Sequence, residues 1–125
     1  CGKYESWFIL EAEKGAGIYL GFKAGVTKDQ IQNCLKEKND LSEFLNFIPV
    51  VKGDYFDIPP GTVHAIGAGV TLLEPQRVLF GKSGVTYRFW DWNRKYDESG
   101  KEKLYPQGFQ LQAISVFICQ PRGAD

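Results

Sequence analysis

The chain has 125 residues, which suits one domain, and 43% of them are hydrophobic, which is enough for a single core. Fifteen basic residues balance fifteen acidic residues, so no overall charge attracts nucleic acid or an anionic membrane surface. No apolar run approaches the roughly 20 residues that a membrane-spanning helix needs. We therefore expect a protein that binds neither nucleic acid nor membranes.

The cysteines are odd in number and far apart, at Cys1, Cys34 and Cys119, without a Cys-x-x-Cys pair. This pattern indicates free thiols in a reducing compartment and predicts a cytoplasmic protein. The chain begins at Cys1, contains no methionine, and enters strand-like sequence at once. We expect it to be a partial chain, with the start of a longer protein missing.

The first elements are two short β-rich runs, Trp7 to Leu10 and Gly17 to Phe22, and the turn between them predicts a hairpin. The period then changes, because Thr27 and Gln30 form a capping-box pattern that predicts a helix to about residue 38. A similar signal at residues 40 and 43 predicts a second short helix. Together they predict a helical insert at about 27–46.

Strand-like runs return at 47–51, 54–58, 63–66, 70–74 and 85–92, separated by glycine and proline, and 111–117 fits either a strand or a short helix. Many short strands with Gly/Pro turns favour an antiparallel sandwich or a small barrel. The predicted fold is mainly β, as one domain over 1–125. The aromatic residues expected in its core, rather than in a sugar-stacking platform, are Trp7, Phe8, Phe56, Phe89, Trp90 and Trp92.

The most informative stretch runs from Gly53 to His64. A strand of alternating polarity leads into Pro59-Pro60-Gly61, which turns the chain, and the returning strand places His64 where it can face a barrel interior. Neutral imidazole is a good zinc ligand, and a barrel shields it while leaving one mouth open. The chain contains a single histidine, and a lone histidine is more often structural, so the surrounding pattern decides.

That pattern resembles the second cupin motif, in which Gly, Pro, Gly and His stand at the spacing of Gly53, Pro59, Gly61 and His64. The resemblance implies a cupin, jelly-roll-like β-barrel. Three further blocks resemble the type I mannose-6-phosphate isomerases: Gly2 to Phe8 is similar to their Gly-Lys-x-Glu-x-Trp-Tyr segment, Leu73 to Gln76 to their Glu-Ile-Gln block, and Thr86 to Arg94 to their Thr-Tyr-Arg-x-Tyr-Asp-Trp-x-Arg block.

The resemblance implies a zinc-dependent enzyme that interconverts mannose 6-phosphate and fructose 6-phosphate through a cis-enediol. It implies that Glu5 and His64 are zinc ligands and that Lys3 and Arg88 are catalytic residues that also bind the sugar phosphate. The family's other zinc ligands lie in an upstream Gln-x-His element, for which this sequence has no residues. The general base is left open between Lys3 and a carboxylate near the metal.

Glu74 and Gln76 are two residues apart on a predicted strand and therefore face the same side. Glu74 either has a direct role in the site, as a residue that binds substrate, or is structural, fixing a turn or a donor that supports the site, and the sequence does not decide between these roles. Two rival functions also stay open. One is a non-catalytic cupin module that binds carbohydrate or regulates, and the other is a different metal-dependent cupin sugar isomerase.

Overall fold

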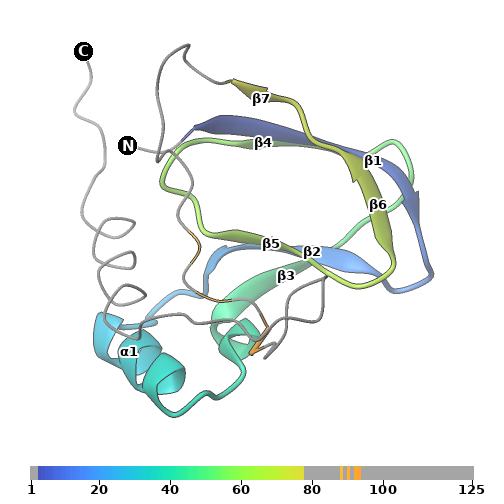
Figure 1. The fold of residues 1–125 in the computed structure, drawn as a ribbon. Helices are drawn as coiled ribbons and strands as arrows, with labels where there is room; N and C mark the ends of the chain where they lie inside the picture. The colour runs from blue at the N-terminus through green and yellow to red at the C-terminus, as the bar shows by residue number, and fades with distance from the viewer. Residues whose placement is uncertain (1–2, 78–87, 89, 91, 94–125) are drawn as a thin grey trace, which may run out of the picture.

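The computed structural model describes residues 3–77, 88, 90, 92 and 93. Its strands form two antiparallel sheets, which face each other as two layers (Figure 1). The first sheet has the order β4-β1-β6, and β7 also pairs with β1; the second has the order β3-β2-β5. The prediction of a mainly β, antiparallel fold is confirmed. The strands within 3–77 do not close into one barrel.

The first sheet is built around the long strand β1 (Tyr4–Ala12), which pairs with β4 (Tyr55–Ile58), β6 (Val70–Leu73) and β7 (Gln76–Arg77). The second consists of β2 (Gly17–Phe22), β3 (Leu45–Pro49) and β5 (His64–Ile66).

The expected helical insert is present as two helices, with β3 following directly. Helix α1 (Lys28–Lys36) begins at the predicted capping box: the Thr27 side chain accepts from the Gln30 backbone, and the Gln30 side chain accepts from the Thr27 backbone. A 3-10 helix, η1 (Leu41–Phe44), supplies the second. Ile31, Cys34 and Leu41 form a small buried cluster between them. None of the described helices is long and apolar enough to cross a membrane.

The predicted hairpin is wrong, and the turn at Pro59-Pro60-Gly61 does not return the chain within one sheet either, because each pair of consecutive strands is divided between the sheets. β1 and β2 belong to different sheets, and so do β4 and β5. Both edges of β1 are already taken by β4 and β6, so β2 cannot pair with it. The Pro59-Pro60-Gly61 turn therefore carries the chain from one layer to the other, and Gly61 adopts the left-handed conformation at φ 86°.

Other boundaries also differ from the prediction. Within the expected strand 85–92, Arg88 and Trp90 are not in a strand and Trp92 is in a turn; its other residues and 111–117 lie outside the described residues. Glu74 lies between β6 and β7 rather than on a strand, because Pro75 has no N–H with which to continue the ladder.

The core lies between the two sheets. Successive residues of β1 point to opposite faces, so Glu5, Trp7 and Ile9 point inward while Phe8 points outward. Trp7, Ile9 and Ile58 from one sheet pack with Ile18 from the other, together with Val50. The core prediction is thus confirmed for Trp7 and wrong for Phe8, which is 40% exposed. One polar residue, Glu5, is buried among the described residues.

Candidate functional site

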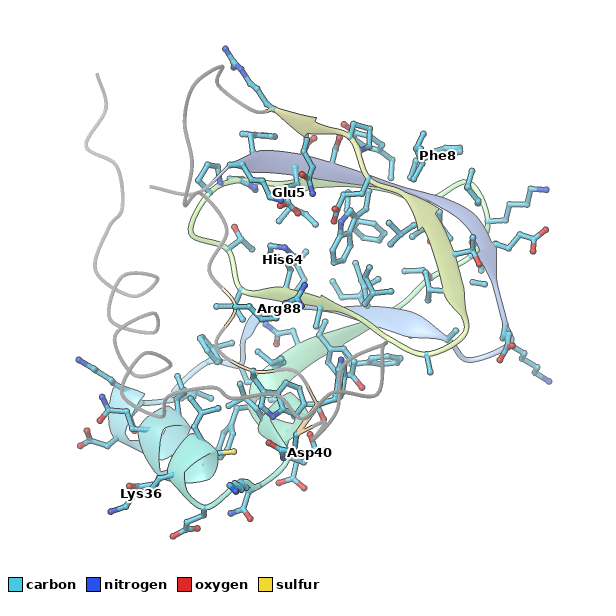
Figure 2. The ribbon with its side chains drawn as sticks, viewed as in Figure 1. Glu5, Phe8, Lys36, Asp40, His64 and Arg88 are labelled. Atoms are coloured by element: carbon cyan, nitrogen blue, oxygen red, sulfur yellow. The ribbon has the colours of Figure 1, made fainter. Side chains whose placement is uncertain are left out.

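The candidate site lies between the layers, where Glu5 of β1 faces His64 of β5 (Figure 2). Glu5 is 6% exposed, and its carboxylate meets a different partner at each oxygen. Oε1 lies 3.1 Å from the Lys3 ammonium nitrogen, and Oε2 lies 3.3 Å from His64 Nε2. Ionised carboxylates are seldom buried without such partners, so the placement of Glu5 depends on both.

Local structure explains why these side chains meet. Lys3 and Glu5 are two residues apart in extended chain and therefore project from the same face. His64 is the first residue of β5 and pairs with Leu20 of β2. The crossing turn before it is closed by a hydrogen bond from the Thr62 amide to the Pro59 carbonyl. The turn thus fixes where β5 begins.

The hydrogen bonding of His64 assigns its tautomer. Nδ1 lies 2.7 Å from the Thr62 carbonyl oxygen, which can only accept, so Nδ1 carries a proton. In the neutral ring Nε2 then presents its lone pair towards Glu5 Oε2. Two acceptors face each other across 3.3 Å, and this arrangement is favourable only with a proton or a cation between or beside them.

Glu5 Oε2 and His64 Nε2 are atoms of the types that bind zinc in proteins. A carboxylate oxygen and an imidazole nitrogen converge, and the other imidazole nitrogen is held by a carbonyl, as is usual for a metal-ligating histidine. Catalytic zinc sites commonly use three protein ligands. Within 3–77, 88, 90, 92 and 93, no group of three or more His, Cys, Asp or Glu residues could hold a metal. The described part of the chain therefore supplies two donors.

The other predicted residues lie at different distances from this pair. Lys3 contacts Glu5 directly. Arg88 is exposed. In the view of Figure 2, Glu5, His64 and Arg88 lie one below the other, with His64 between Glu5 and Arg88. No ion pair joins Arg88 to Glu5 among the described atoms. Glu74 is exposed and accepts hydrogen bonds from Trp7 and Gln76.

One neighbour of the site was missed by the sequence reasoning. The Trp7 ring packs edge to face against the His64 imidazole, with the centroids 5.2 Å apart and the planes at 78°. The signal was available, because Trp7 follows Glu5 by two residues on one strand and must share its face. The strand pattern predicted a core position for Trp7 but did not indicate its contact with His64.

Comparison with known proteins identifies relatives of the chain, although no family model matches it. "Mannose-6-phosphate isomerase" from Streptococcus mutans is 38% identical over 98% of this chain and 36% of that protein. "Mannose-6-phosphate isomerase ManA" from Bacillus subtilis is 41% identical over 92% of this chain and 34% of that protein. The crystal structure of the mannose 6-phosphate isomerase from Bacillus subtilis aligns with this chain at a TM-score of 0.68 and 28% identity. The alignment covers 98% of this chain and 36% of the chain in that crystal structure. The chain spans about a third of the length of these relatives.

Proposed function

We propose that this chain, which is homologous to mannose-6-phosphate isomerases over most of its own length, supplies one wall of a zinc-dependent sugar-phosphate isomerase site in a cupin-type barrel. The proposed reaction interconverts mannose 6-phosphate and fructose 6-phosphate. One observation carries the proposal: Glu5 Oε2 and His64 Nε2 face each other between the sheets, with the histidine's other nitrogen committed to a carbonyl.

In this proposal Glu5 and His64 hold the zinc ion, which supplies Lewis acidity for polarising the sugar carbonyl. The remaining zinc ligands would come from a longer protein that contains this chain, in the part that corresponds to the relatives' sequence outside the aligned region. The residues of this chain provide the setting. Burial of Glu5 and the packing of Trp7 against His64 exclude water from one side of the pair, which strengthens electrostatic interactions there.

Aldose–ketose isomerisation removes a proton from the carbon next to the carbonyl and returns one to the adjacent carbon, by way of a cis-enediol. Lys3 is a candidate for this transfer, because its nitrogen lies 3.1 Å from Glu5 and can exchange a proton with a carboxylate or with substrate. Glu5 is the other candidate. Glu74 contacts Trp7 and Gln76 rather than Lys3 or His64, which makes it a weaker choice.

Arg88 is proposed to bind the phosphate group. Its planar guanidinium can make two parallel hydrogen bonds to a phosphate, and it is exposed, as a group that meets a soluble substrate must be. Arg88→Ala is expected to raise the KM for mannose 6-phosphate more than that for unphosphorylated mannose. Equal effects on the two sugars would count against phosphate binding.

The decisive experiment combines zinc analysis with an assay on mannose 6-phosphate, in a full-length protein that contains this chain. We expect Glu5→Ala and His64→Ala each to lose zinc and turnover, with unchanged far-ultraviolet circular dichroism. Glu11→Ala removes an exposed carboxylate from the same strand and serves as the matched control. Full turnover in His64→Ala would refute the proposal. Binding of the sugar phosphate without any turnover in the unmodified protein would favour the non-catalytic cupin module.

A further inference from the structure

The Trp7 side chain contacts both His64 and a carboxylate, that of Glu74. Trp7 is 1% exposed, and its ring lies against the imidazole at 5.2 Å and 78°. Its indole nitrogen donates to Glu74 Oε2 at 2.6 Å. The residues stand 67 positions apart in sequence, and the pairing of β1 with β6 and β7 brings them together.

The Glu74 carboxylate is itself held in place. Gln76, which stands directly opposite Glu5 in the β1–β7 pairing, donates its side-chain amide to Glu74 Oε1. Each oxygen of Glu74 thus has a protein donor. A hydrogen bond to an ionised acceptor is stronger than one to a neutral acceptor, and a buried indole N–H without a partner is destabilising. Glu74 therefore selects the Trp7 orientation in which the N–H reaches it.

The orientation of Trp7 limits that of His64. The imidazole is held at Nδ1 by the Thr62 carbonyl, and the edge-to-face contact with Trp7 restrains rotation of the ring about that bond. If the indole turned, this side of the imidazole would lose its packing partner. Aromatic pairs of this kind are more favourable than the buried area alone accounts for, so the contact biases the rotamer of the imidazole.

We propose that Glu74 and Trp7 are positioning residues that act in series, with Glu74 fixing the indole and the indole fixing the His64 imidazole so that Nε2 points at Glu5. The consequence for metal binding rests on the zinc site proposed above, whereas the effect on His64 orientation does not. This assignment gives Glu74 a supporting role behind the site that is independent of any contact with substrate.

The single histidine makes the test specific, because the ring carbons and protons of His64 give the one imidazole signal in a histidine-labelled sample. We would record it by NMR in the 125-residue chain without metal, for Glu74→Leu and Trp7→Phe. Leucine removes both acceptors, and phenylalanine keeps an aromatic ring but removes the indole N–H. Glu11→Leu, at an exposed position of β1, is the matched control.

Glu74→Leu and Trp7→Phe are expected to move the His64 ring signals much further than the control variant does. The reason is that the aromatic ring beside His64 is reoriented in Glu74→Leu and replaced in Trp7→Phe, which changes the ring-current shift that it produces at His64. Glu74→Leu should also move the Trp7 indole N–H signal, which is assigned by its loss in Trp7→Phe. Unchanged His64 signals, together with a moved indole signal, would overturn the proposal. If Glu74→Leu fails to fold, Glu74→Gln keeps one acceptor and is expected to show a smaller displacement of the same signals. No displacement of the His64 signals in Glu74→Gln would likewise overturn the proposal.

Zinc titration separates this proposal from the zinc site. Loss of a residue that supports a metal ligand commonly weakens metal binding by about 10–100-fold, and we expect Glu74→Leu to fall in that range in the full-length protein. An unmodified full-length protein that binds no zinc, with His64 signals that still respond to Glu74→Leu, would refute the zinc site and leave the positioning role standing. Unchanged His64 signals and unchanged zinc affinity in the variant would refute the positioning role alone.

Discussion

The ion pair between Lys3 and Glu5 permits a quantitative test of how the site is held together. The two charged atoms are 3.1 Å apart, and the side chains are 14% and 7% exposed. At an effective dielectric constant of about 20 the attraction alone is about 5 kcal/mol, from which the loss of hydration must be subtracted. Exposed pairs retain about 0.2–1 kcal/mol. For this enclosed pair we expect a coupling energy of about 1–3 kcal/mol.

The measurement is a double-mutant cycle with Lys3→Met, Glu5→Gln and the double variant. The free energy of unfolding would be obtained from urea denaturation followed by circular dichroism, with a chelator present so that metal does not contribute. Glu5→Gln alone is expected to cost about 2–4 kcal/mol, because it leaves the Lys3 ammonium enclosed beside a neutral amide and also alters the contact with His64. Lys52→Met removes an exposed lysine and should stay within about 0.5 kcal/mol of the unmodified chain.

A coupling energy below about 0.5 kcal/mol would refute the expectation of an enclosed pair, since it lies well within the range of about 0.2–1 kcal/mol for solvent-exposed pairs. It would mean that water reaches Lys3 and Glu5 freely in solution. The same result would weaken Lys3 as the group that exchanges protons, because a lysine that moves freely in water is not held in position against Glu5 or a substrate.

Two further predictions concern the crossing turn and the helical pair. Gly61→Ala forces alanine into φ 86° and should cost about 1–2 kcal/mol and move the His64 ring signals; Gly15→Ala, at φ 80° in a distant turn, should cost as much and leave those signals unchanged. Similar His64 signals in both variants would contradict the role of the turn. Burial and nearby carboxylates raise the pKa of the Cys34 thiol, the carboxylates being those of Asp40, Glu43 and Glu37. The native state then holds this proton more tightly than the unfolded chain, so its stabilisation is complete below the ordinary thiol pKa and is lost as pH rises through the raised one. Urea unfolding between about pH 8 and pH 10 should show a steeper loss of stability in the unmodified chain than in Cys34→Ala, and parallel curves would count against it.

The sequence predicted the elements better than their partners. The capping box at Thr27 and Gln30 located the start of α1, and the β-rich run from Trp7 to Leu10 located part of β1. Neither signal states which sheet the next strand joins. The Pro59-Pro60-Gly61 turn reads equally well as a hairpin or as a crossing between layers, and the structure shows a crossing because β4 pairs with β1 and β5 with β2.

The candidate site was predicted unevenly for a similar reason. The resemblance to an isomerase family singled out Glu5 and His64, and the structure brings them within 3.3 Å of each other, although their metal-binding role stays a prediction. The partnership of Trp7 with Glu74 depends on how β6 and β7 pair with β1, and no local pattern reports on contacts between residues so far apart in sequence. Family motifs named the residues that are proposed to act in the reaction, whereas the contacts that support these residues could be identified only from the fold.

The two proposed zinc donors belong to different sheets, and this has a consequence for stability as well as for chemistry. Among the described strands, Glu5 is on the central strand of one layer and His64 on an edge strand of the other. An ion held by both would tie the layers together at the point where the buried carboxylate otherwise meets an imidazole lone pair. Ligand binding to the native state alone stabilises it by about 2.7 kcal/mol at one hundred times the dissociation constant. Zinc would therefore stabilise the contact between the sheets through the same two residues that are proposed to hold it for catalysis, and a longer protein that completes the ligand set would gain both effects together.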